Sequence, residues 1–524
     1  MTTSKWWCWR RVRWIVFEGK GEKQTMSERE RWTRRQFLER TSGAALAAGL
    51  AAQAKGAAAS AAPRRRPNIL FIFPDELRGQ ALGTMGQPDV KTPNLDRLAA
   101  QGVTLPTTFA NTPLCCPARA TMLTGTYPHR HGVRSNDLPL ADDKVTLAEI
   151  LRAHGYRTGF IGKWHLDGGP RLPGYIPPGG RRQGFELWAA NECRHNYFDT
   201  WYFRDSPLMI PIEGYDAYTW TDVAIEFLGQ MRGEQPFCLF VAYDPPHFPI
   251  PLTTPVAPRE YIEMYDPAKL HLRPNWQGSG YGTRRQDIAA YYGAITCIDH
   301  EVGRVMKALD AQGLAEDTIV LFTSDHGDMM GSHGFRMKRK PWEEAIRVPG
   351  IIRYPAGLEA GQHRDYLFSH VDMLPTLLGL ANLPIPSHLQ GTDYSPGLRG
   401  SKFKEPPSVY FQNYMPYGDM GTSFPGWRAV RTRRYKYART RGKAWLLYDL
   451  ENDPYEMHNL VDQPGHRDLQ QQIDAELARQ MERAGDSWNY DFTEFIPLYN
   501  RTEKEYQELL AEIRAGRFQV GPHP

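Results

Sequence analysis

The stretch Asn68-Ile69-Leu70-Phe71-Ile72-Phe73 runs into Pro74-Asp75-Glu76, so an apolar segment ends directly in two acidic residues. Because the apolar residues do not alternate with polar ones, the segment predicts a short strand buried on both faces, as in parallel sheets. Three further segments have the same character: Thr158–Gly162, Phe237–Tyr243 and Thr318–Thr323.

Helical patterns lie between these predicted strands. Thr92-Pro93 begins a helix that Gly102 ends, Thr146 begins another that ends at Gly155, and a longer amphipathic stretch covers Asp287–Gln312. Strands that alternate with helices indicate the α/β class, with a large, mixed but mostly parallel sheet sandwiched by helices. A chain of 524 residues exceeds one compact core and indicates at least two domains.

The C-terminal part follows a different pattern, with strands next to each other in sequence. We therefore assign residues 67–405 to the α/β domain and 406–524 to a smaller α+β domain with an antiparallel sheet. The elements expected there are strands at Trp427–Tyr437 and Ala444–Leu450, separated by the polar turn Thr440-Arg441-Gly442, and helices at Asp468–Ala484 and Thr502–Ala515.

The net charge of +4 is unevenly distributed along the chain. Residues 1–66 carry 15 Lys/Arg and 5 Glu, a net charge of +10, so the remaining residues carry a net charge of −6. The basic character therefore belongs to the N-terminal segment, and the rest of the chain gives no support for nucleic-acid binding. Six cysteines in 524 residues also exclude a small disulfide-rich scaffold.

Residues 1–66 are expected to be an N-terminal extension with an export signal. Thr33-Arg34-Arg35-Gln36-Phe37-Leu38 precedes a short apolar run, Gly43 to Ala52, and then the small-residue stretch Ala57 to Ala62. These parts resemble the twin-arginine export signal of bacteria, with Met26 as the expected start. The apolar run is too short to span a bilayer, which takes about 20 residues. We expect export by the twin-arginine translocase to the periplasm or medium, without a stable membrane span.

Charged residues follow each of the four predicted strands. Asp75 and Glu76 follow the first, Lys163 and His165 the second, Asp244 and His247 the third, and Asp325 and His326 the fourth. In open α/β sheets, ligands bind beyond the carboxyl ends of the strands. The pattern therefore predicts one charged pocket at that edge of the sheet.

A candidate nucleophile lies in Leu114-Cys115-Cys116-Pro117-Ala118-Arg119. Pro117 favours the first turn of a helix, which would place Cys115 at the positive end of the helix dipole. Arg119 follows one turn later on the same face, an arrangement suited to chemistry on an anion. On these grounds alone, a pair of buried structural thiols is an equally good interpretation.

Cys-x-Pro-x-Arg followed by Leu123-Thr124-Gly125 resembles the signature of the type I sulfatases, in the alkaline phosphatase superfamily. The resemblance covers about residues 67–465. The other matching blocks are Thr92–Asp96, Tyr127–Gly132, Gly162–His165, Pro245–His247, Ser324–Asp328, Glu343–Pro349 and Tyr448–Pro454. It implies a sulfuric ester hydrolase, in which a cytoplasmic formylglycine-generating enzyme converts Cys115 to Cα-formylglycine. The hydrated aldehyde is a geminal diol. One hydroxyl attacks sulfur and expels the alcohol, and the second, once deprotonated, lets the aldehyde re-form as sulfate leaves.

The resemblance also implies a divalent cation bound by Asp75, Glu76, Asp325, His326 and the modified Cys115. Two positions depart from the family pattern: Glu76 and His326 stand where many members have aspartate and asparagine. Glu76 therefore coordinates from a longer side chain or not at all. Calcium prefers oxygen ligands, whereas imidazole suits transition metals. We expect calcium, and manganese or zinc stay open as alternatives.

The remaining expected catalytic residues are carried over in the same way. Lys163 and Lys338 are expected to hold the sulfate oxygens, although a lysine next to Lys338 is an alternative. His165 is expected to take a proton from the diol, and His247 to protonate the leaving alcohol, a role that the pKa of histidine suits. Arg119 is expected to hold the nucleophile and the metal-site carboxylates in place.

The sequence indicates the substrate less directly than the catalytic residues. The segment Arg171–Gly214 is rich in arginine and aromatic residues, among them Trp188, His195, Tyr197 and Trp201. Such side chains stack on sugars or aryl groups, or simply pack a surface insertion. We expect a sulfated carbohydrate, with small aryl sulfates as surrogates. The alternatives are a phosphodiesterase or phosphonate monoester hydrolase of the same superfamily, and a catalytically silent module that binds sulfated polysaccharide.

Overall fold

The computed structural model describes residues 66–488 apart from 169–170, 172, 232–234, 250–253, 279, 281, 415–416, 420–421 and 425. The expected N-terminal export signal, the expected start Met26 and the helix predicted at Thr502–Ala515 lie outside these residues. In the described residues, no helix is long and apolar enough to cross a membrane.

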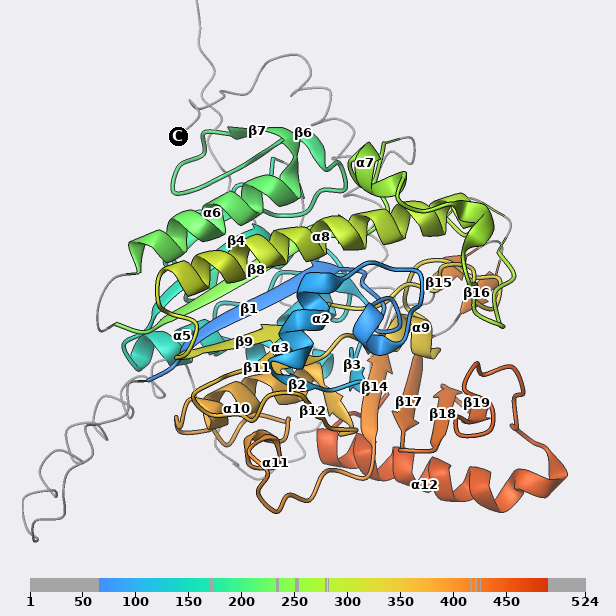
Figure 1. Ribbon diagram of the computed structural model, residues 1–524. Helices are drawn as coiled ribbons and strands as arrows, with labels where there is room; N and C mark the ends of the chain where they lie inside the picture. The colour runs from blue at the N-terminus through green and yellow to red at the C-terminus, as the bar shows by residue number, and fades with distance from the viewer. Residues whose placement is uncertain are drawn as a thin grey trace, which may run out of the picture.

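An eight-stranded sheet forms the centre of the molecule, in the order β12-β2-β11-β9-β1-β8-β4-β5 (Figure 1). Five neighbouring strands, β9 to β5 in this order, run parallel, and β11 is antiparallel to both of its neighbours. The strands are β12 Gln362–His363, β2 Val103–Thr104, β11 Ile351–Arg353, β9 Thr318–Phe322, β1 Asn68–Asp75, β8 Phe237–Pro246, β4 Arg157–Lys163 and β5 Leu187–Asn191. The mixed, mostly parallel sheet is confirmed, as are all four predicted strands.

Strand β1 is buried along its whole length because helices cover both faces of the sheet. Leu70 and Ile72 belong to a core shared with the helices of one face, whereas Ile69 and Phe71 belong to a core on the other. The first face carries α2 Pro93–Ala100, α6 Asp216–Gln230 and α8 Arg285–Ala311, and the second α3 Cys115–Thr124, α5 Leu147–Ala153 and α10 His370–Leu380. The helices predicted from Thr92, Thr146 and Asp287 are all present.

The C-terminal part forms a four-stranded antiparallel sheet, β14-β17-β18-β19, against which α12 packs (Figure 1). The elements are β14 Val409–Asn413, β17 Trp427–Arg431, β18 Tyr435–Thr440, β19 Lys443–Asp449 and α12 Arg467–Ala484. The prediction of one strand over Trp427–Tyr437 is wrong: a turn at 432–434 divides it into β17 and β18. Thr432 makes this turn by accepting a hydrogen bond from the backbone of Tyr435 on its hydroxyl.

Short elements complete the fold. The small sheets contain β3 Thr108–Phe109, β10 Arg347–Val348, β13 Phe368–Ser369, β6 Phe198–Tyr202, β7 Ile210–Tyr215, β15 Tyr417–Asp419 and β16 Thr422–Phe424. The short helices are η1 Gly83–Met85, α4 Pro128–His131, η2 Gly180–Arg182, α7 Arg259–Ile262, η3 Pro267–Lys269, α9 Glu343–Ile346, α11 Ser395–Leu398 and η4 Pro464–His466.

Candidate active site

The residues predicted at the strand ends meet around the first turn of α3. Asp75 ends β1 and Lys163 ends β4, while Asp325 and His326 follow β9 closely. Cys115 is the first residue of α3, so its side chain lies at the positive end of a ten-residue helix. All five residues are buried. The prediction that separate strand ends converge on one charged site is therefore confirmed.

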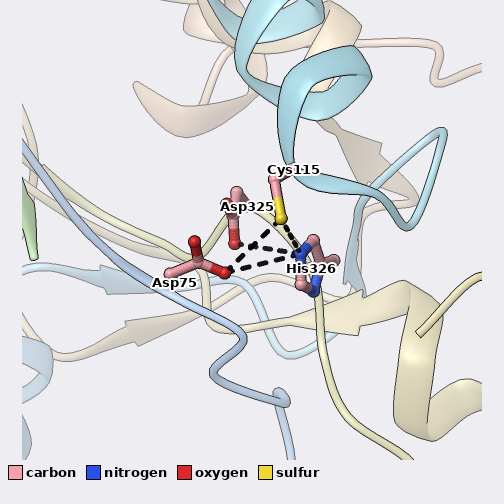
Figure 2. Close-up of side chains that lie close together, drawn as sticks. All are labelled: Asp75, Cys115, Asp325 and His326. Carbon is pink, nitrogen blue, oxygen red and sulfur yellow. Dashed lines mark hydrogen bonds and ion pairs between the residues drawn. The ribbon is translucent and has the colours of Figure 1, made fainter. Parts of the chain in front are cut away.

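Four of these side chains form a compact group (Figure 2). The Cys115 sulfur lies 3.2 Å from Nε2 of His326 and 3.8 Å from Oδ1 of Asp75. The same imidazole nitrogen lies 3.5 Å from Asp75 Oδ1 and 3.7 Å from Asp325 Oδ1. One potential ligand atom from each residue falls within 4.8 Å of the others, a spacing that suits a shared cation.

The hydrogen bonds around His326 fit such a cation. Its Nδ1 lies 3.0 Å from the carbonyl oxygen of Gly327 and donates a proton to it. In the neutral ring, this bond leaves the lone pair of Nε2 facing the cysteine and the two carboxylates. Metal-binding histidines are commonly oriented by a bond of this kind on the other ring nitrogen. With two carboxylates opposite, the donor set therefore fits a divalent cation.

Arg119 joins three parts of the site. Its guanidinium donates to Asp325 Oδ2 at 3.0 Å, to Asp75 Oδ2 at 3.3 Å and to the backbone carbonyl of Lys163 at 2.5 Å. Since these residues follow or end three different strands, one buried arginine on α3 fixes their relative positions. This geometry agrees with the predicted task of holding the metal-site carboxylates.

The two lysines give the site a strongly positive field. Burial, and then the Asp75 carboxylate, act to raise the pKa of the Cys115 thiol, but Lys338, Lys163 and His326 are among the positive groups that together hold it well below its ordinary value. Burial also acts to raise the pKa of Asp75, yet its ion pair with Lys163 is the main reason that this pKa lies well below the usual range. The surrounding positive charge therefore favours the anionic form of both groups.

A second group lies next to the first and contains Glu76, His247 and Lys338. The Glu76 carboxylate lies 3.1 Å from His247 Nε2 and 3.3 Å from Lys338 Nζ, and the lysine nitrogen is 2.5 Å from the same imidazole nitrogen. The side chain of Glu76 thus groups with Asp75 and His247, and it is absent from the four-residue group that contains Cys115. Its backbone N–H donates to Asp325 Oδ1 at 3.0 Å.

Lys338 is the lysine of its segment that reaches these residues. Lys340 turns away and donates to the carbonyl oxygens of Arg336 and Lys338. The residues on either side of Lys338 have left-handed backbone conformations, with φ of 63° at Met337 and 73° at Arg339. Non-glycine residues adopt this region at a cost, which is met at functional sites by the surrounding packing.

His165 does not belong to the four-residue group around Cys115. Its Nε2 lies 3.4 Å from Asp137 Oδ1, and its Nδ1 is buried without a hydrogen-bond partner among the described residues. Arg171 donates twice to the same Asp137 carboxylate, at 2.7 and 2.9 Å. The role of His165 as base for the diol stays a prediction.

One residue of the site was not among the predicted catalytic residues. The His195 ring stacks on the ring of His247, with centroids 3.9 Å apart and planes 13° from parallel. The sequence signal that pointed to His195 was the aromatic segment Arg171–Gly214. Other aromatic rings of this segment do not stack on a described active-site residue. Trp188 and Tyr197 are buried in the two cores, and Trp201 lies under the Arg194 guanidinium.

These features define a class of enzyme. A buried nucleophile lies at a helix N-terminus among lysines and an arginine, next to a donor set for a divalent cation and a histidine–lysine pair. Such a site suits hydrolysis of a negatively charged ester, in which the cations neutralise the oxygens of the reacting group. The protein is therefore a hydrolase of anionic esters with an α/β fold.

Comparison with known proteins identifies the family. The sulfatase model matches residues 67–383, and the model of the N-sulphoglucosamine sulphohydrolase C-terminal region matches residues 331–483. An ulvan-active sulfatase of Formosa agariphila is 38% identical over 428 residues, which cover 81% of this chain and 82% of that protein. Human arylsulfatase A is 32% identical, covering 77% and 85%. The chain belongs to the sulfatase family and is a sulfuric ester hydrolase.

Solved structures agree. A putative sulfatase, yidJ, of Bacteroides fragilis superposes with a TM-score of 0.73 at 31% identity, covering 83% of this chain and 99% of that one. The phosphonate monoester hydrolase of Agrobacterium radiobacter shares the fold, with a TM-score of 0.66 at 24% identity and coverage of 80% and 96%. A match to the cyclin-dependent kinase inhibitor model at residues 459–509 is too short to show a family.

Proposed function

We propose that this sulfatase acts through a formylglycine formed from Cys115 and that its substrate is a sulfated carbohydrate. The observation that carries the first part is the position of Cys115. Its buried side chain lies at the N-terminus of α3 and touches a metal-type donor set. A sulfate ester hydrolyses very slowly in water, so the enzyme must supply a strong nucleophile and charge neutralisation.

The charged residues are assigned to the transferring sulfate and the leaving alcohol. Lys163 and Lys338, both buried and cationic, would hold the non-bridging sulfate oxygens. His247, which lies beside Lys338, would deliver a proton to the leaving oxygen. His165 would take a proton from the diol when sulfate is released, and Arg119 would keep the nucleophile and the carboxylates aligned.

Asp75, Asp325 and His326 would hold the divalent cation together with the modified residue 115. When bound, such a cation polarises the sulfate and lowers the pKa of the nucleophilic hydroxyl. Calcium fits the two carboxylates, while the imidazole keeps manganese and zinc open. Glu76 groups with Asp75 and His247 instead, and its carboxylate contacts His247 and Lys338, so it stands outside the proposed ligand set.

The proposed substrate class rests on relatives. Two of them are named an ulvan-active sulfatase and an N-acetylglucosamine-6-O-sulfatase, the second 26% identical over 492 residues. The proposed cell biology rests on residues 1–66 alone: modification by a formylglycine-generating enzyme in the cytoplasm, then export by the twin-arginine translocase to the periplasm or medium. A cleaved N-terminus in the exported protein would support this route.

The test uses protein produced with a formylglycine-generating enzyme. Mass spectrometry of the tryptic peptide that contains residue 115 should detect the aldehyde, and an unmodified thiol in active protein would overturn the mechanism. Activity should be compared on 4-nitrophenyl sulfate and a nitrophenyl phosphate diester. A larger kcat/KM on the diester would favour the phosphodiesterase alternative. A panel of sulfated glycans, with ulvan oligosaccharides included, should then identify the substrate.

A further inference from the structure

The stacked pair His195–His247 links two segments of the active site. His247 follows β8, whereas His195 lies in the loop between β5 and β6. Both rings are buried, with 6% of His195 and 3% of His247 exposed. A centroid distance of 3.9 Å with nearly parallel planes is full contact of one ring face on the other. The loop after β5 therefore covers one face of the imidazole that we assign to leaving-group protonation.

His195 contacts the active site through the face of its ring, because neither of its ring nitrogens is hydrogen-bonded to a described active-site residue. Its Nε2 lies 3.6 Å from the Cys193 sulfur within the same loop, which anchors the ring. Its Nδ1 is buried and has no hydrogen-bond partner among the described residues. A second contact from this loop holds the backbone, since the Tyr197 hydroxyl donates to the carbonyl oxygen of His247 at 2.7 Å. The loop thus fixes His247 at its main chain and at its ring.

The ring of His247 needs this support because its edges face different partners. Nδ1 lies 2.8 Å from the carbonyl oxygen of Phe248, and Nε2 faces Lys338 and Glu76. Rotation of the ring about its bond to Cβ would swing Nε2 away from both. A flat ring packed on the face blocks this rotation, because the two planes must stay parallel.

We propose that His195 is a positioning residue, whose ring face fixes the plane of His247 so that Nε2 is presented to the leaving oxygen. This inference rests on the proposed role of His247. Proton transfer in a transition state depends on heavy-atom distance and alignment, and a displacement of about 1 Å costs on the order of a hundredfold in rate. The flat face is what matters, so another flat ring should serve.

The experiment compares His195→Leu, which fills the space without a flat ring, with His195→Phe, which keeps one. The substrates are phenyl sulfates whose phenols range from acidic to weakly acidic, because an acidic phenol leaves without a proton. For His195→Leu we expect kcat to fall by about tenfold or more on the poorest leaving groups, little on 4-nitrophenyl sulfate, with KM little changed. His195→Phe should restore a leaving-group dependence close to that of the wild type.

Controls separate this inference from the proposed function. His300→Ala removes an exposed histidine that packs on Tyr261, away from the site, and should leave the kinetics unchanged. Formylglycine content and melting temperature are measured for every variant, and His195→Asn replaces His195→Leu if the latter does not fold. If His247→Gln does not lose kcat selectively on the poorest leaving groups, the acid role of His247 fails. If His247→Gln loses kcat selectively on the poorest leaving groups and the non-aromatic His195 variant does not, the positioning role is overturned. It is overturned as well if His195→Phe loses kcat on those substrates as the non-aromatic variant does.

Discussion

Replacement of Arg119 by methionine tests how the site is assembled. Arg119 is 2% exposed and donates to two carboxylates and one backbone carbonyl from three strand ends. Removal of one partner from a buried ion pair costs about 3–5 kcal/mol, because the remaining charges lose their compensation. Arg119→Met should therefore lower the free energy of unfolding by about that amount, with a fall in Tm of several degrees.

The loss of activity should exceed what unfolding explains. Asp75 and Asp325 would repel each other and move apart, so kcat/KM per folded molecule should fall by about a hundredfold or more. Thermal unfolding at a fixed scan rate, circular dichroism and kinetics on 4-nitrophenyl sulfate measure the two effects separately. Because a bound cation would replace part of the lost positive charge, added Ca²⁺ should recover part of the Tm of Arg119→Met.

Arg428 supplies a matched control. It is fully buried in the C-terminal sheet, pairs with Asp486 and donates to the carbonyl oxygen of Asn413 at 3.1 Å. Arg428→Met should destabilise the protein by a similar amount, while kcat per folded molecule and the effect of Ca²⁺ on Tm stay as in the wild type. A wild-type Tm and wild-type kcat/KM in Arg119→Met would refute this account of the site.

Three further predictions follow from the same geometry. Lys338→Ala should lower kcat/KM on sulfate esters by about a hundredfold or more, since it removes a cation from the reacting group. Lys340→Ala should act mainly on Tm, and equal kinetic losses in the two variants would contradict the assignment of Lys338. His326→Asn should raise the activity that Ca²⁺ restores after chelation, relative to the activity that Mn²⁺ or Zn²⁺ restores, measured with each metal. Burial raises the pKa of Glu192 to about 8 from 4.5, so the folded state binds more protons between these pH values and stability falls as pH rises through that window. Glu192→Gln should escape this loss, which has a ceiling of about 5 kcal/mol; parallel curves of Tm against pH for variant and wild type would argue against it.

Much of the fold could be predicted because its signals are local. An apolar run such as Asn68–Phe73 can only be buried on both faces, and Thr146 with Glu149 forms the capping box that starts α5. The strand predicted at Trp427–Tyr437 was wrong for the converse reason. The strand-like residues continue through 432–434 without a clear break in the sequence. The division into β17 and β18 depends on a turn stabilised by the Thr432 hydroxyl and on pairing with β14 and β19.

The sequence by itself determined which residues end the strands and begin α3, and hence the reactive groups at the sheet edge: Asp75, Cys115, Lys163, Asp325 and His326. Parallel strands end at one edge, so local order along the chain was sufficient to predict that Asp75, Lys163, Asp325 and His326 converge. Cys115 was added to this group by the family resemblance.

Only the tertiary structure decided how the remaining side chains share the work. It turned Glu76 toward His247 and stacked His195 on the face of that histidine. Each outcome depends on the direction in which a loop side chain points across a space formed by distant segments. Backbone conformation and packing set that direction, and residue spacing along the chain does not contain it.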